Sequence, residues 1–369
     1  DQAATGSENG LSWENAFTDI QQALTRAISS EEVLEIWVAA GTYVPTSGTD
    51  RNISFSLADG VDLLGGFKGS ESSKEDRDPT ANPTYLSGQI NGLGADDNSL
   101  HILKAENLLE PTLLDGFSIE NGYASGTGID RHGAGLLVIN TINLEIRNCT
   151  FHRNMSQNGD GAGIYLSNSH DLDFENILFD LNTARGDGGA IYLDTESYYI
   201  SWDRCVFNKN ISSTEDGGAI AIFGGVSSRN NRITYSLFTD NESQRGGAIY
   251  LAKNGSVEIG NTTFADNSAP SSKGSAVNAR GELVLYNSIL FRNSDQNPLV
   301  IEENEKEKFV TYSLIEGGFS GEQNINANPQ FVNPAAGNYT LSPNSPAIDK
   351  GRSVFFPLDL SGQERVNGE

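Results

Sequence analysis

A short motif of glycine and other small residues recurs through the middle of the sequence, and its even spacing constrains the fold more than any other feature. Each copy has glycine first, two small residues next, and leucine, isoleucine or valine last. The copies start at Gly133, Gly161, Gly188, Gly217, Gly246 and Gly274, with spacings of 28, 27, 29, 29 and 28 residues. Self-similarity at this period predicts a repeat protein whose units stack on their neighbours, so 369 residues fit one elongated domain.

The pattern within each repeat predicts strands. Apolar residues alternate with polar ones over short runs that are separated by glycine, asparagine and aspartate. No repeat offers the run of about ten residues at 3.6 periodicity that a helix requires. We therefore predict an all-β fold, namely a single-stranded right-handed parallel β-helix (a solenoid) in which each repeat forms one rung. The hand follows from the usual preference of parallel crossover connections.

Equivalent residues of successive rungs should lie directly over one another. Asparagine suits the corners, because it tolerates left-handed backbone and because stacked side-chain amides can bond to each other. One predicted inward stack is Phe151, Phe179, Phe207, Phe238 and Phe264, and a second is Leu136, Ile164, Ile191, Ile220, Ile249 and Val277. The predicted asparagine column is Asn154, Asn182, Asn210, Asn241, Asn267 and Asn293.

The two ends of the chain differ from the regular array. Apolar residues at helical spacing behind Ser12 predict a capping helix over residues 12–28, which would cover the open end of the solenoid. We assign residues 1–99 to this N-terminal cap and the first irregular rungs. Residues 100–318 are assigned to regular rungs of about 26–31 residues. Residues 319–369 are expected to form an extended, truncated C-terminal cap.

Composition excludes several classes of partner. The net charge of −25, from 24 Lys and Arg against 49 Asp and Glu, argues against binding to nucleic acid or to an anionic membrane. No apolar run reaches the roughly 18 residues of a transmembrane helix, so no direct membrane insertion is expected. Cys149 and Cys205 would lie two rungs apart, at about 10 Å, which is too far for a disulfide. We interpret both cysteines as core residues.

Two tetrapeptides, Phe-x-x-Asn and Gly-Gly-Ala-Ile, together resemble the repeats of the chlamydial polymorphic membrane proteins, which are surface-exposed right-handed parallel β-helices implicated in adhesion. Residues 12–17, 36–43 and 345–351 resemble the flanks of bacterial secreted proteins with a choice-of-anchor domain. This resemblance, together with the polar start that is typical of a processed fragment, implies an extracellular or outer-surface location. Relatives usually continue beyond residue 362 with an anchoring segment, so the mode of anchoring stays open.

A polar column precedes the glycine motifs and holds the candidate chemistry: His132, Asp160, Asp187, Asp216, Arg245 and Lys273. The stacked carboxylates of Asp160, Asp187 and Asp216 repel one another unless something compensates. Three interpretations stay open, namely a hydrated corner in which aspartate forms the turn, a Ca²⁺ site, and a catalytic cluster with a general acid. We favour the hydrated corner, because no cluster of arginine or lysine is present that would neutralise a uronate. No cofactor is therefore required, with Ca²⁺ as the alternative.

A second column places Tyr165, Tyr192 and Tyr250 on the outer face of the strand that follows each glycine motif. Outward tyrosines could stack on sugar rings or meet a protein partner, although such ladders more often pack on themselves and stabilise the sheet. We name them as the candidate binding residues.

These observations favour an adhesin-like binding or stalk module that recognises an extracellular glycan or a surface protein of a host or neighbouring cell, without catalysis. Because the β-helix fold hosts many functions, two alternatives stay open. One is a polysaccharide lyase or glycoside hydrolase that uses the aspartate column. The other is a structural unit that self-associates end to end.

Overall fold

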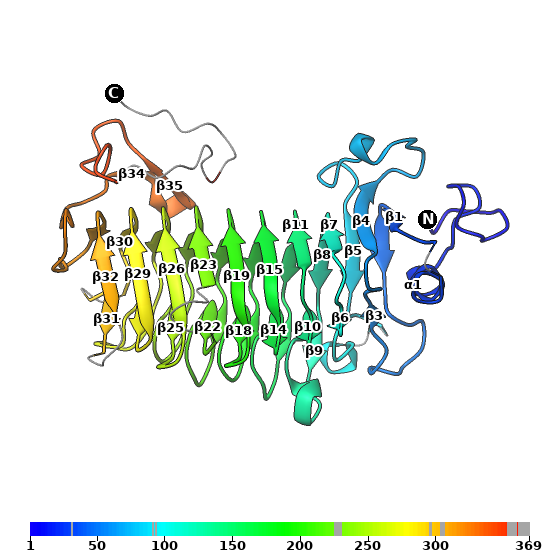
Figure 1. The fold of residues 1–369 in the computed structure, drawn as a ribbon, viewed down its shortest axis with the longest axis horizontal. Coiled ribbons are helices and arrows are strands. Elements are labelled where there is room, and N and C mark those ends of the chain that lie inside the picture. Colours follow the sequence, from blue (N-terminus) through cyan, green and yellow to red (C-terminus); the bar gives the residue numbers. More distant parts are fainter. Residues whose placement is uncertain are drawn as a thin grey trace.

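Three long parallel sheets, wound by one chain, form the body of the molecule (Figure 1). The computed structural model describes residues 1–30, 32–90, 92, 94–224, 231–294, 297–302, 307–352 and 360. Each rung adds one strand to each sheet, and neighbouring strands come from successive rungs. The predicted all-β parallel β-helix is confirmed.

The bounds of the described elements follow the order of the rungs. Sheet A consists of β1 Glu35–Ala39, β4 Asp62–Phe67, β7 Thr112–Asp115, β11 Leu144–Arg147, β15 His170–Glu175, β19 Tyr198–Asp203, β23 Asn231–Thr234, β26 Ser256–Gly260, β29 Glu282–Tyr286 and β32 Lys308–Thr311. Sheet B consists of β2 Gly41–Tyr43, β5 Thr84–Ser87, β8 Phe117–Glu120, β12 Thr150–His152, β16 Leu178–Asp180, β20 Val206–Asn208, β24 Leu237–Thr239, β27 Thr263–Ala265, β30 Ile289–Phe291 and β33 Leu314–Ile315. Sheet C consists of β3 Phe55–Ser56, β6 Leu103–Glu106, β10 Leu136–Ile139, β14 Ile164–Ser167, β18 Ile191–Leu193, β22 Ile220–Ile222, β25 Ile249–Leu251, β28 Val277–Ala279 and β31 Leu299–Ile301.

The smaller elements lie at the corners and ends. A short fourth sheet contains β9 Tyr123–Ala124, β13 Met155–Ser156, β17 Thr183–Ala184 and β21 Ile211–Ser212. An antiparallel hairpin is formed by β34 Phe331–Asn333 and β35 Asn338–Leu341. One α-helix, α1, spans Ile20–Ile28, and the 3-10 helices are η1 Lys74–Asp76, η2 Ala95–Asp97, η3 Gly128–Arg131 and η4 Pro334–Ala336.

The predicted inward stacks form the core. The five phenylalanine rings from Phe151 to Phe264 are all buried and nearly parallel, with centroid separations of 5.2, 4.8, 4.4 and 4.8 Å. The aliphatic stack from Leu136 to Val277 is also fully buried. Both cysteines are buried and free, as predicted. Like side chains therefore pack on like side chains along one axis.

The asparagine column is a buried ladder of amides. From Asn154 to Asn267, each amide N–H donates to the side-chain oxygen of the asparagine on the next rung, at 2.9–3.1 Å. The amides also bond the backbone. Asn182 Nδ2, for example, donates to the Phe151 carbonyl, and the Asn182 side-chain oxygen accepts from the Asn154 backbone N–H. The left-handed backbone belongs to another column, in which Asn148, Asn176, Asn261 and Asn287 have φ between 49° and 55°. The two roles predicted for corner asparagines thus fall on different residues.

The glycine motif also divides two roles. Its first glycine has left-handed backbone, as at Gly188 with a φ of 66°. Its second glycine is required by contact between rungs, because a Cβ on Gly189 would lie 2.1 Å from the Gly218 carbonyl oxygen. In this copy of the motif a side chain is therefore excluded at Gly188 and at Gly189 for different reasons.

The predicted helix over residues 12–28 is wrong at its start, since α1 begins at Ile20. Asp19 is the N-cap, and its side chain accepts a hydrogen bond from the Gln21 N–H. Upstream, Ser12 closes a turn with Asn15 instead. Trp13 packs against Trp37, with ring centroids 6.2 Å apart, so a long-range aromatic contact replaces the helical turn. Within the described ranges, no helix is long and apolar enough to cross a membrane.

The C-terminal segment folds back along the side of the solenoid (Figure 1). Tyr339 in β35 hydrogen-bonds Thr239 at 2.9 Å and Asp266 at 2.7 Å. Farther along, the Arg352 N–H donates to the Asn287 side chain. The rest of the predicted C-terminal cap, residues 353–359 and 361–369, lies outside the described residues.

We expect the asparagine ladder to be a main source of stability. Asn182→Ala removes two amide donations and leaves the Asn154 N–H without its acceptor in the core. The cost should be about 3 kcal/mol, because buried unsatisfied groups carry their full desolvation penalty. Urea unfolding measures it, with the exposed Asn158→Ala as the control that should change stability by less than about 0.5 kcal/mol. Equal midpoints for the two variants would contradict this role.

Candidate functional site

The predicted aspartate column is one continuous ladder of hydrogen bonds. Asp160 Oδ1 accepts from the Asp187 N–H at 2.8 Å, and Asp187 Oδ1 accepts from the Asp216 N–H at 3.0 Å. The ladder ends on His132, which accepts from the Asp160 N–H, and on Arg245, which pairs with Asp216. The three carboxylates are thus brought together. Asp160 and Asp187 each accept a backbone N–H from the next rung, and Asp216 forms an ion pair with Arg245 of the rung after it.

Asp187 has an unusual acidity within this ladder. Burial raises the pKa of its carboxyl to about 7, and the negative charges of Asp160 and Asp216 act in the same direction. A carboxyl with such a pKa could donate a proton near neutral pH, as the catalytic alternative requires. The same pKa also arises in a purely structural stack of like charges.

Calcium binding to this column stays a prediction. In the described part of the chain, no three His, Cys, Asp or Glu side chains form a group that could hold a metal ion. If the aspartates nevertheless bind Ca²⁺ through turn carbonyls, EGTA should lower the melting temperature and added Ca²⁺ should restore it. A melting curve that EGTA leaves unchanged would remove this hypothesis.

The tyrosine column lies beside the aspartates. The rings of Tyr165 and Tyr192 stack with centroids 5.1 Å apart and planes 3° apart, and His132 lies over Tyr165. Tyr250 differs from the expected outward residue because it is only 3% exposed, with Arg245 over its ring. Since the ring faces contact each other, a ligand would reach mainly ring edges and hydroxyls rather than stack on a free face.

A groove that we did not predict runs along the outer side of sheet A, near its turn into sheet B. Its volume is about 950 Å³, and η1 with its following loop walls one end. It crosses five successive rungs, from β4 to β19, so its length is about 20 Å. The lining residues are Asp62, Leu64, Lys74, Glu75, Arg77, Pro79, Thr80, Leu113, Asp115, Arg147, Asn148, Cys149, Thr150, Asn176, Ile177, Leu178, Arg204 and Val206. We call it the sheet A groove.

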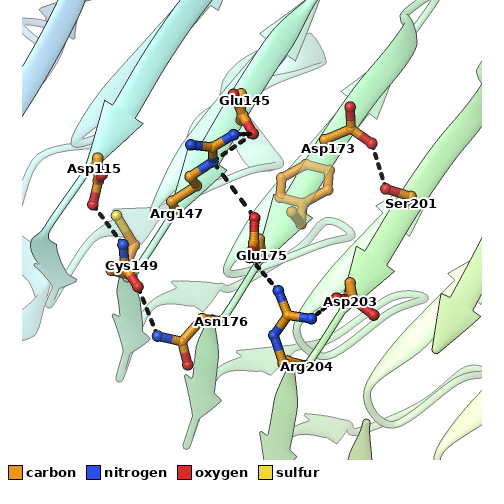
Figure 2. A network of polar contacts seen from close by, with 12 residues as sticks. Asp115, Glu145, Arg147, Cys149, Asp173, Glu175, Asn176, Ser201, Asp203 and Arg204 are labelled. Atoms are coloured by element: carbon orange, nitrogen blue, oxygen red, sulfur yellow. Dashed lines mark hydrogen bonds and ion pairs between the residues drawn. The ribbon is translucent and has the colours of Figure 1, made fainter. Parts of the chain in front are cut away.

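Opposite charges alternate in a row on sheet A, and two members of the row, Arg147 and Arg204, line this groove. Figure 2 shows Arg147 between Glu145 and Glu175, and Arg204 between Glu175 and Asp203. The parallel register places Arg147 opposite Asp115 on one side and Glu175 on the other, which favours pairing across strands. Arg147 and Glu175 keep 42% and 40% of their side chains exposed, so both retain N–H and oxygen groups that a ligand can reach.

At the end of the groove beside η1 the ion pair is more buried. Arg77 binds Asp115 at 2.5 Å, and its other amino group donates to the Gly65 carbonyl at 3.1 Å. Asn148 also donates to Asp115, and Asn176 donates to Asn148. The recurrence of charged residues one repeat apart was a signal for this row, whereas the wall comes from an irregular loop without a repeat pattern.

The raised pKa of Asp187 has a consequence for stability. Because the folded carboxyl binds its proton more tightly than the unfolded one, its ionisation destabilises the fold as pH rises from about 4 to 7. Asp187→Asn should therefore raise stability at pH 8 by on the order of 2 kcal/mol and change it little at pH 4. Urea unfolding at both pH values measures the difference. A gain of equal size at pH 4 and pH 8 would show that the carboxyl's ionisation is not the cause.

Comparison with solved structures finds weak similarities. A pectin methylesterase from Aspergillus niger is 15% identical, with 89% of this chain and 94% of that chain covered and a TM-score of 0.42. A surface adhesin of Streptococcus pneumoniae is 12% identical, covering 80% and 81%, with a TM-score of 0.38. An α-1,3-glucanase catalytic unit from Streptomyces thermodiastaticus is 12% identical, covering 89% and 67%, with a TM-score of 0.36. Similarities this low carry no argument about function.

Sequence comparison is more decisive about the family. No curated protein matches the chain significantly. The family described as right-handed beta helix region matches over residues 92–264 and again over residues 134–333. The two matches together span well over half of the sequence, and the parallel coil of the structure agrees with them. The chain therefore belongs to the right-handed β-helix family.

Proposed function

We propose that this chain is an extracellular, adhesin-like binding module that holds a glycan in the sheet A groove and does not chemically alter it. The observation that supports the proposal is the row of alternating charged side chains on sheet A, from which Arg147 and Arg204 line a groove about 20 Å long. Guanidinium groups only donate hydrogen bonds and carboxylates only accept them. A sugar hydroxyl does both, so a row of sugar rings can satisfy such a surface.

The charge of the groove favours a neutral glycan. Its lining contains Lys74, Arg77, Arg147 and Arg204 against Asp62, Glu75 and Asp115, and the arginines are already paired with carboxylates. The whole chain carries a charge of −25. The net negative charge of the molecule would therefore repel a polyanion. The paired arginines of the groove would not compensate for that repulsion.

The catalytic alternative is supported by one observation, which is the pKa of Asp187 near 7. Neighbouring rungs are about 4.8 Å apart, close to the 5–5.5 Å between the carboxyl groups of retaining glycosidases. Two facts favour the structural role instead. One oxygen of Asp160 and one of Asp187 accept backbone N–H groups, and neither residue lines the sheet A groove.

The C-terminal end of the solenoid argues against end-to-end assembly. There, the Ile315 N–H donates to the Ile325 carbonyl, and the Asn324 side chain donates to the Val310 carbonyl. A segment of the same chain thus occupies part of the edge that a second copy would need.

A glycan array tests the proposed function. The unmodified chain should retain a neutral polysaccharide, and Arg147→Ala should weaken that binding at least tenfold, since it removes exposed donors from the middle of the groove. Arg185→Ala is the matched control, because Arg185 is exposed, lies outside the groove and donates to the Asn158 side chain.

Two results would contradict the proposal. One is equal retention by the Arg147→Ala and Arg185→Ala variants. The other is release of sugar products by the unmodified chain in a panel of hydrolase and lyase substrates, with loss of that release in Asp187→Asn, which would establish the catalytic alternative.

A further inference from the structure

The N-terminal end of sheet A is left open, although the ends of the other two sheets are covered. Gln21 of α1 donates to the Pro45 and Ser54 carbonyls, beside the first strands of sheets B and C. Gln2 donates to the Thr42 carbonyl in β2. In the described part of the chain, no hydrogen bond joins residues 1–30 to the backbone of β1. Within the described residues, the hydrogen bonds of the N-terminal cap therefore reach β2 and the residues beside β2 and β3, but not the backbone of β1.

The register shows which groups of β1 are free. The Asp62 N–H donates to the Leu34 carbonyl, and Glu35 lies opposite Asp62. Because the peptide groups of a parallel strand alternate in direction, those of Glu35 and Trp37 must point away from β4. Their N–H and C=O groups have no partner among the contacts of the described residues. These peptide groups can therefore hydrogen-bond one further strand at the edge of sheet A.

A hollow of about 1000 Å³ lies against this edge. One wall is apolar and is formed by Ile20 and Ala23 of α1, and aromatic residues Trp13 and Phe17 contribute the other wall. The charged residues of the lining are mostly acidic, with six acidic residues and two basic ones. The acidic residues are Asp1, Asp19, Glu32, Glu35, Asp62 and Glu71, and the basic residues are Arg26 and Lys74.

We propose that this hollow binds an extended basic peptide strand, which pairs with β1 and extends sheet A by one strand. The free peptide groups of Glu35 and Trp37 supply two donors and two acceptors in strand geometry. Apolar side chains on one face of the guest strand would pack on Ile20 and Ala23, and cationic side chains would meet the carboxylates. The excess of four negative charges in the lining favours a basic segment over a neutral sugar.

A capped seven-residue peptide of alternating lysine and valine is the probe. Two of the three tryptophans, Trp13 and Trp37, line the hollow, whereas Trp202 is fully buried elsewhere, so tryptophan emission reports occupancy. We expect a saturable change in emission that weakens as salt is raised. A control peptide with proline at alternate positions should not bind, because it lacks the donors.

Glu35→Pro separates strand pairing from general attraction. Proline removes the outward N–H of Glu35 but no ladder bond to β4, a position where strands tolerate it. It should weaken binding at least tenfold, whereas Glu35→Gln, which loses the same charge, should bind within about threefold of the unmodified chain. Thermal melting verifies that both variants are folded.

If Glu35→Pro does not fold, amide hydrogen exchange of the unmodified chain tests the proposal instead. The amides of Glu35 and Trp37 should exchange more slowly at saturating peptide. Three results would overturn the proposal: no peptide binding, equal affinity of folded Glu35→Pro and Glu35→Gln, or unchanged exchange at these two amides. A response to cellohexaose without a response to the peptide would also overturn it, and would identify the hollow as a sugar site.

Discussion

The rest of the structure depends on the vertical register between rungs. The buried asparagine ladder contributes to it directly, because each amide bonds the side chain of one neighbouring rung and the backbone of the other. A slip of one residue would turn every inward side chain of a strand toward solvent. The phenylalanine stack, the aspartate ladder and the charged row of the sheet A groove all inherit their spacing from this register.

Stacking has opposite electrostatic consequences on different sides of the molecule. Where the repeat places aspartates over one another, burial and repulsion raise the pKa of Asp187, and backbone N–H groups with Arg245 provide compensation. Where it places Arg147 over Glu175, the same rung spacing brings opposite charges together. A column of identical residues is therefore a natural place for structural hydrogen bonding, while a column of alternating charges leaves exposed groups for a ligand.

Repetition explains which features could be predicted. The core stacks of Phe151 and Ile164 were readable because one local pattern recurs in successive rungs, and each copy has the same environment. The start of α1 was not, since Trp13 fits a helical pattern locally but packs on Trp37 from a distant segment. The sheet A groove was also missed, because its wall around Arg77 belongs to an irregular loop. Tyr250 is covered by its neighbours Arg245, Arg280 and Phe223, which its place in the repeat pattern does not indicate.

The returning C-terminal segment has a mechanical consequence. Tyr339 bonds Thr239 and Asp266, and Arg352 bonds Asn287, so one strap joins three successive rungs. A solenoid pulled from its last coil would ordinarily unwind one coil at a time. With the strap in place, tension at that end must first detach Arg352 from Asn287 and then Tyr339 from Asp266 and Thr239 before the last coil can separate.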